Sequence, residues 1–378
     1  MATLINPGLA DELQEYGADD VGKCFNCGNC SAVCVHSEAP HVLPRRSMHA
    51  LQLGLEDKLK SSLEPWLCYY CGECSEQCPK EAEPGETMMS MRRWLTAKYD
   101  FSGIAGLFYR SWRFEVFAIV LAAILTGIGF TLFGVLGSGS IDVYDGPGAF
   151  LPAYWVHRFD WAMAAVLAVL LGINALRMWR YVMKDTGAGI GSYLAALPQL
   201  PLQFFTQPKF RQCERKRPWA VHLALMLSYV TMLVLIMFFL HSMQSGPEID
   251  WRAHVFGYLA SIGLITAVIL NLRGRLRKDS PQHEHSHESD WMFLILLLVV
   301  AVTGVLQHVL HRTGLDVAAN VAYVVHLMGV VPMLVLEVPF GKWSHLAYRP
   351  LAVYYAQVQA HAEARAAEDA KRAAAEAA

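Results

Sequence analysis

The residues best suited to chemistry in this chain are cysteines. Eight of the nine lie in two copies of one spacing pattern, Cys24-x-x-Cys27-x-x-Cys30-x-x-x-Cys34 and Cys68-x-x-Cys71-x-x-Cys74-x-x-x-Cys78. Runs of this spacing hold 4Fe–4S clusters, and the fourth cysteine of each run binds the other cluster. We therefore predict one cluster on Cys24, Cys27, Cys30 and Cys78, and a second on Cys68, Cys71, Cys74 and Cys34.

Disulfides and zinc sites are the other uses of paired cysteine runs. A zinc ion takes four ligands, so a zinc site built from the first two cysteines of each run would leave the third and fourth cysteines of each run unexplained. Thiolate clusters belong in a reducing compartment, and we expect the cytoplasm. The ninth cysteine, Cys213, has no partner at a suitable spacing and is interpreted as incidental.

The composition and the apolar runs of the chain indicate which structural elements position these cysteines. Hydrophobic residues make up 54% of the 378 residues and charged residues 17%, which is membrane-like, and the length suggests two or three domains. Beyond residue 100 the chain has six apolar runs of nearly the ~20 residues that cross a bilayer. The runs lie at 114–136, 159–178, 219–241, 255–272, 291–311 and 321–341. We predict an all-α protein with a two-cluster ferredoxin domain (1–100), a six-span membrane domain (101–350) and an Ala-rich tail (351–378).

The ferredoxin domain is predicted to be helical. Apolar residues recur at helical spacing in segments 8–20, 44–54, 55–63 and 88–98. The first twenty residues lack a basic start and a continuous apolar stretch, so we expect no signal peptide.

Orientation in the membrane is predicted from the basic residues of the loops. Loops 179–218 and 273–290 hold seven and four Lys or Arg residues, whereas loops 137–158, 242–254 and 312–320 hold one each. Basic loops stay on the inner side of the membrane. Both termini and the ferredoxin domain are therefore expected in the cytoplasm. The basic loops are explained by topology and lipid headgroups, so we infer no nucleic-acid partner.

Histidines in the third and sixth runs predict haem. His222 and His241 lie 19 residues apart, as do His326 and His345, and 19 residues of helix span about 28 Å. In antiparallel helices this brings His222 level with His345 on the inner side, and His241 level with His326 on the outer side. Two b haems, each held by two histidines, would fit.

Other histidines compete for these roles. Four at the outer helix ends could replace an outer ligand: His157, His254, His308 and His311. An interfacial histidine is also commonly a hydrogen-bonded anchor. The loop His283-Glu-His-Ser-His-Glu288 is interpreted as a solvated linker.

A carboxylate inside the sixth run is a further candidate. Glu337 lies 11 residues after His326, three helical turns, which places both on about one face. Intramembrane carboxylates are costly and often functional. We predict that Glu337 handles protons at a quinone site near the inner haem, with a structural hydrogen bond as the alternative. Pro332 and Pro339 are expected to kink this helix.

The sequence resembles known families. Its first hundred residues resemble the two-cluster ferredoxin that forms the C subunit of heterodisulfide reductase. The stretch Val338-Pro-Phe-Gly-Lys-Trp-Ser-His345-Leu-Ala-Tyr-Arg-Pro350 is similar to the cytochrome b (gamma) subunit of respiratory nitrate reductase. Both parts in this order resemble the membrane-bound C subunit of the quinone-interacting membrane-bound oxidoreductase (Qmo) complex. The nitrate reductase pattern supports His222 with His345, and His326, but its other early-helix ligand falls where this chain has Met232, which argues against His241.

These resemblances imply a function. The chain would relay electrons between menaquinone and two flavoprotein subunits, and ultimately adenylylsulfate reductase, through two b haems and two clusters. It carries no Gly-x-Gly-x-x-Gly nucleotide fingerprint, so substrate chemistry is expected on another subunit. The alternatives are the membrane subunit of another heterodisulfide reductase or hydrogenase type complex, and a haem-free membrane anchor for a ferredoxin domain.

Overall fold

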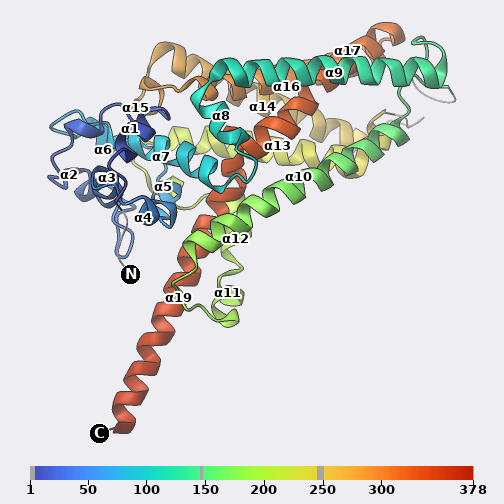
Figure 1. The fold of residues 1–378 in the computed structure, drawn as a ribbon. Coiled ribbons are helices and arrows are strands. Elements are labelled where there is room, and N and C mark those ends of the chain that lie inside the picture. Colours follow the sequence, from blue (N-terminus) through green and yellow to red (C-terminus); the bar gives the residue numbers. More distant parts are fainter. Residues whose placement is uncertain (1–4, 145–147, 245–250, 378) are drawn as a thin grey trace.

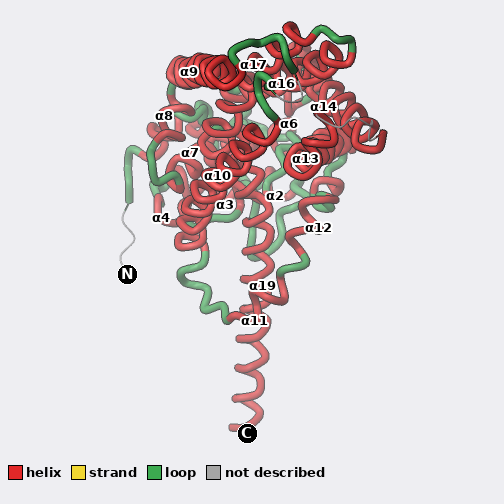
Figure 2. The backbone as a smooth tube through the Cα atoms, turned by 90° about the vertical axis from the view of Figure 1, so that its right-hand side faces the viewer, coloured by secondary structure: helices red, strands yellow, loops and turns green. Residues whose placement is uncertain are grey.

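The computed structural model describes residues 5–144, 148–244 and 251–377, and the side chains of residues 241–244 lie outside that description. Every regular element in the described residues is a helix (Figure 2), and their one extended pairing is a bridge between Glu38 and His41. The prediction of an all-α protein is confirmed.

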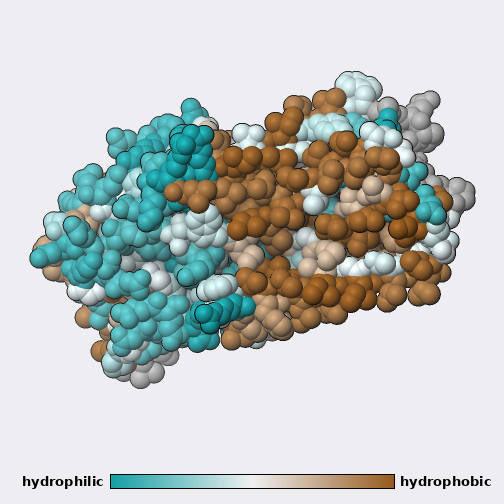
Figure 3. Space-filling view, turned by 90° about the horizontal axis from the view of Figure 1, so that it is seen from above, coloured by the Kyte–Doolittle hydropathy of each residue, from teal (hydrophilic) through white to brown (hydrophobic). Residues whose placement is uncertain are grey.

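Within the described residues, six helices are long and apolar enough to cross a membrane. They are α9 (Trp112–Ser138), α10 (Ala153–Val182), α13 (Lys216–Gln244), α14 (Trp251–Arg277), α16 (Glu288–Arg312) and α17 (Asp316–Pro332), the last continued by a π-helix (Met333–Glu337) and α18 (Val338–Phe340). Apolar side chains such as Leu136 and Phe238 point outward, 85% and 67% exposed, as suits helices that face lipid. Figure 3 shows this surface in brown beside the hydrophilic N-terminal part.

Short helices build the N-terminal part, which lies at one end of the long helices (Figure 1). They are α1 (Leu9–Gln14), η1 (Val21–Lys23), α2 (Asn29–Ala32), α3 (Arg45–Gln52), α4 (Glu56–Lys60), α5 (Glu64–Leu67), α6 (Glu73–Glu76), α7 (Pro84–Tyr99) and α8 (Ile104–Arg110). Three of them, α1, α3 and α4, lie within the segments where helical spacing predicts helices, and α7 extends beyond the predicted segment 88–98 at both ends. Met88, Met91 and Trp94 of α7 are at most 1% exposed and pack in the hydrophobic core.

The N-terminal part and the long helices share one core. Tyr99, at the end of α7, stacks on Tyr181 of α10 and meets Tyr348 of α19 (His345–Ala377) edge-on, with ring centroids 5.9 and 5.6 Å apart. Arg177 of α10 donates a hydrogen bond to the Tyr99 carbonyl at 2.8 Å. Helices α11 (Ile190–Ala196) and α12 (Gln199–Thr206) pack on α19. The N-terminal part is therefore fixed to the bundle by buried contacts.

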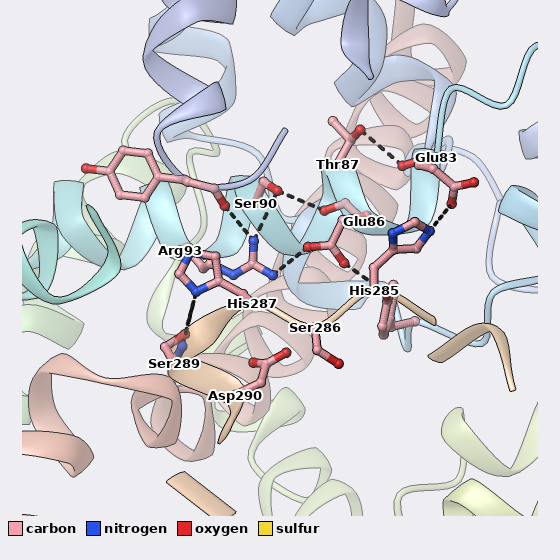
Figure 4. A network of polar contacts seen from close by, with 12 residues as sticks. Glu83, Glu86, Thr87, Ser90, Arg93, His285, Ser286, His287, Ser289 and Asp290 are labelled. Carbon is pink, nitrogen blue, oxygen red and sulfur yellow. Dashed lines mark hydrogen bonds and ion pairs between the residues drawn. The ribbon is translucent and has the colours of Figure 1, made fainter. Parts of the chain in front are cut away.

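The interpretation of the histidine-rich loop as a solvated linker is wrong. Helix α15 (Pro281–Glu284) approaches Gly72, where no side chain is in the way. His285 Nε2 then lies 3.4 Å from Glu83 Oε2 of the N-terminal part, and His287 is only 12% exposed. Figure 4 shows both histidines beside α7. The loop is a contact between the two parts of the chain.

Arg93 of α7 lies at the centre of this contact and is buried. It donates to the Tyr16 carbonyl at 2.5 Å and to Glu86 Oε1 at 2.6 Å (Figure 4). Arg93→Ala is expected to lower the free energy of unfolding by about 3 kcal/mol, because it leaves the Glu86 carboxylate without its cation. Thermal unfolding in detergent measures this. The control, Arg110→Ala, removes an exposed pair with Glu15 and should cost less than about 1 kcal/mol. Equal losses would contradict the prediction.

The sixth membrane helix contains a π-helix directly after Pro332. A π-turn inserts extra backbone, which rotates the residues after it relative to those before it. His326 and Glu337 are consequently not on one face, contrary to the prediction from their spacing. His326 contacts Thr303 of α16 at 3.1 Å, whereas Glu337 interacts with Glu115 of α9.

Candidate iron–sulfur and haem sites

The two cysteine runs fold alike. In each run the residue before the second cysteine and the glycine after it have left-handed backbone, with φ of 62° and 86° at Asn26 and Gly28 and 54° and 87° at Tyr70 and Gly72. Glycine adopts this conformation at no steric cost. The two left-handed residues turn the backbone sharply, so that the first three thiols of each run gather on one side of the chain.

The first predicted cluster site contains a cysteine from each run. Cys24, Cys27, Cys30 and Cys78 line one cavity, and the Ala82 N–H donates to Cys78 Sγ at 3.4 Å. The structure thus brings together the four residues assigned to the first cluster. Cys27 is exposed, so this site opens to solvent.

The second predicted site is more enclosed. Cys34 lies near Cys68 and Cys71, and Cys74 interacts electrostatically with all three. Cys74 is buried, and the Tyr70 N–H donates to Cys68 Sγ at 3.4 Å. The four residues assigned to the second cluster are again neighbours, at the face that meets the membrane helices. That each set ligates a cluster stays a prediction.

Residues 20–82 match the 4Fe-4S dicluster domain family. A protein of Archaeoglobus profundus that is named as similar to the C subunit of heterodisulfide reductase is 32% identical over 104 residues, 27% of this chain and 55% of that protein. The iron–sulfur C subunit of the CoB–CoM heterodisulfide reductase of Methanopyrus kandleri is 31% identical over 102 residues, 25% of this chain and 53% of that protein. No solved structure matches.

The chain spans about half the length of the curated relatives it matches. Its N-terminal part contains the 4Fe-4S dicluster domain and is related to the C subunit of heterodisulfide reductase, and six helices in the described residues are able to span a membrane. The expected 4Fe–4S domain and the relation to heterodisulfide reductase are confirmed. The relatives from methanogens are named as subunits of heterodisulfide reductases.

The two inner histidines lie next to each other, both on the membrane-helix side of the junction between the two parts. The ring centroids of His222 and His345 lie 6.3 Å apart. His222 Nδ1 is 2.9 Å from Gln207 Oε1, and His345 Nδ1 is hydrogen-bonded to the Lys342 carbonyl. Metal-bound histidines commonly donate their other ring N–H to such acceptors. Each ring therefore has Nε2 available, and burial lowers the pKa of His345 to about 3, which keeps it in the neutral, metal-binding form.

A cavity of 230 Å³ adjoins this histidine pair, and we call it the interface cavity. Its walls come from both parts of the chain: Trp66, Tyr69, Tyr70, Arg92 and Arg93 on one side, and His222, Tyr229, Lys342, His345 and Arg349 on the other. The basic side chains in this wall suit the carboxylates of a haem. The residues present thus fit the predicted inner haem.

Arg349 joins the interface cavity to the second cysteine site. Its Nη2 donates to the Cys68 carbonyl at 3.1 Å, and its guanidinium lies 3.9 Å from the centroid of the Tyr69 ring. Arg92 donates to the same carbonyl, and burial lowers its pKa to about 9. A residue that lines the proposed haem site, Arg349, is therefore in direct contact with residues of the second cysteine run.

The outer histidines are less well paired. His326 packs on α16, with Thr303 Oγ1 3.1 Å from its Nδ1, and the side chain of His241 lies outside the described residues. Of the alternative ligands, His254 and His308 face each other with ring centroids 5.1 Å apart. His157 instead accepts a hydrogen bond from a tryptophan. His241 with His326 stays a prediction.

Glu337 lies beside a second buried carboxylate, Glu115, which the interpretation of the sequence did not identify. Glu337 and Glu115 are 0% and 1% exposed, and their four carboxyl oxygens have no hydrogen-bond partner among the other described residues. The two groups interact with each other. Tyr109, just before the membrane helices, lines the interface cavity, and burial together with the nearby Glu337 and Glu115 raises its pKa. The carboxyl pair thus lies behind the cavity wall.

Two further residues near the sites carried no usable sequence signal. Cys213 is 0% exposed and packs beside Cys71, a contact that the spacing of the cysteines does not predict. Gln207 contacts His222 from a loop whose path depends on tertiary packing. Glu115 could have been found, since it is a carboxylate within the predicted first span.

Proposed function

We propose that this chain is the membrane subunit of a quinone-linked oxidoreductase complex. It relays electrons between menaquinone and cytoplasmic flavoprotein subunits through two b haems and two 4Fe–4S clusters. Adenylylsulfate reductase is the proposed final partner. The complex lies in the inner membrane, with the ferredoxin domain and both termini in the cytoplasm. The basic loops at the end of the bundle that carries the N-terminal part support this orientation.

One observation carries the proposal. His222 and His345 face each other beside a cavity whose opposite wall includes Tyr69, the residue that follows Cys68. The proposed haem ligands and the proposed second cluster run thus border one cavity. An ordinary structural role for the two histidines does not account for both rings holding Nδ1 on an acceptor and leaving Nε2 free.

The chain's own residues prepare this site for electron transfer. Bound haem and clusters supply the one-electron carriers. Gln207 and the Lys342 carbonyl fix the orientation of the two histidine rings. Arg349 and Arg92 hold the Cys68 carbonyl against the cavity. At the far end, exposed Cys27 leaves the first cluster accessible to a partner.

A reduced-minus-oxidised absorbance spectrum of the purified protein tests the proposal. The expected result is a b-type α-band together with the electron paramagnetic resonance (EPR) signals of two clusters. A protein with clusters and no α-band would be the haem-free membrane anchor. Reduction of the haem by a menaquinol analogue then tests the link to quinone.

A second candidate is the membrane subunit of a heterodisulfide reductase or hydrogenase type complex. It is favoured by the relatives, one of which is named as the C subunit of an H(2):CoB-CoM heterodisulfide,ferredoxin reductase in Methanothermobacter marburgensis. The complex isolated with this chain decides between the two. Co-purified adenylylsulfate reductase supports the first candidate, and a hydrogenase supports the second.

The carboxyl pair is the proposed proton site of quinone chemistry. The carboxyl groups of Glu337 and Glu115 are buried and interact with each other. Two such groups cannot both be ionised at low cost, so the pair retains a proton. Glu337→Gln is expected to slow quinol oxidation about 100-fold, the scale of a lost acid–base group. Stopped-flow reduction of the haem measures this. Glu288→Gln, at a residue with a 62% exposed side chain, is the control. Unchanged rates in Glu337→Gln would contradict the role.

A further inference from the structure

One short loop reaches both predicted inner redox sites. It runs from Gln207 to Cys213 and includes the helix η2 (Phe210–Gln212). The Gln207 amide nitrogen contacts Met226 Sδ at 3.1 Å, so its oxygen faces His222 Nδ1 at 2.9 Å. The loop therefore accepts the ring N–H of a proposed haem ligand.

Six residues further on, the same loop places a thiol in the second cysteine site. Cys213 is 0% exposed and packs with Tyr69, Phe210 and Cys71. Its Sγ is 3.4 Å from His36 Nε2, and its thiol interacts with the Cys71 thiol packed beside it. Cys213 belongs to neither cysteine run, yet it is a fifth thiol beside the four of the predicted second cluster.

Polar contacts fasten this thiol in place. The Glu214 N–H donates to Glu73 Oε1 at 3.1 Å, and Arg215 pairs with Glu76 at 2.8 Å. Both carboxylates belong to α6, the helix that carries Cys74. Because the residues after Cys213 are tied to the cysteine run itself, the loop holds a fixed position relative to the second cluster site.

We propose that Cys213 is a positioning residue that tunes the second cluster by donating a hydrogen bond from its thiol to the Cys71 sulfur. A cluster-bound Cys71 is a thiolate and can only accept, so the proton must come from Cys213. Hydrogen bonds to ligand sulfurs are one of the means by which proteins set cluster potentials. The donor stabilises the more negative, reduced cluster and raises its potential. This inference rests on the proposed two-cluster function and not on the haems.

An EPR-monitored redox titration of the full-length protein tests the role. In Cys213→Ala the ratio of reduced to oxidised second cluster at a fixed potential is expected to fall by up to about tenfold, ~59 mV for one electron. The first cluster should keep its potential and serves as the internal control. Cys213→Ser retains a hydrogen-bond donor and should recover part of the shift.

Three results would overturn the role of Cys213. They are an unchanged second-cluster potential in Cys213→Ala, an equal shift of both clusters, and loss of the second cluster with half the iron, which would make Cys213 a ligand. A wild-type protein without two clusters would overturn the proposed function as well. The wild-type titration therefore separates the two failures.

Discussion

Replacing His345 with alanine is expected to remove one of the two proposed b haems while both iron–sulfur clusters remain. His345 and His222 approach each other with ring centroids 6.3 Å apart, and each holds its Nδ1 on an acceptor. Loss of either ring leaves a haem with one protein ligand next to a cavity. The α-band of the reduced protein should fall by about half, and quinol-driven reduction of the clusters should be lost.

The matched variant for this test is His222→Ala. It should leave the same residual spectrum as His345→Ala, because both histidines serve one haem. His361→Ala, in the projecting part of α19, is the control and should leave the spectrum unchanged. If His222→Ala and His345→Ala leave different haems behind, the two residues do not share a haem and the pairing is wrong.

Replacing Cys78 with alanine should destroy the first cluster although Cys78 belongs to the second run. The structure places Cys78 in the cavity lined by Cys24, Cys27 and Cys30. A cubane needs four thiolates, so removal of one converts or releases that cluster. The iron content should about halve, and one of the two EPR signals should disappear.

The identity of the remaining signal decides the assignment. Cys78→Ala should leave the same signal as Cys27→Ala, a variant within the first run. Cys34→Ala should match Cys71→Ala in the same way. If Cys78→Ala matches Cys71→Ala, each run holds its own cluster and the exchange of fourth cysteines is refuted.

The features that could be predicted from the sequence are those that depend on local spacing. Cysteine periodicity led to the two thiol groups, and apolar periodicity led to the helices of the N-terminal part and the six membrane helices. The proximity of His222 and His345 could also be predicted, because antiparallel helices of equal length bring residues at matched depths together.

The features that were missed depend on tertiary contacts or on a break in periodicity. The π-helix after Pro332 shifts Glu337 away from His326 and toward Glu115, which a count at 3.6 residues per turn does not foresee. Cys213 has no neighbour in the sequence with which to form a motif. The histidine-rich loop is polar like a linker, and its burial depends on the space beside Gly72.

The shared core around Tyr99, Tyr181 and Tyr348 has a kinetic consequence. A ferredoxin that diffuses to a membrane partner has a docking rate that varies with concentration and salt. Here the covalent link and the packed aromatic rings replace that encounter by a permanent one. Transfer between the proposed inner haem and the proposed second cluster is then expected to be first order and unaffected by ionic strength. Only the later step to a partner that docks near Cys27 should depend on partner concentration and salt.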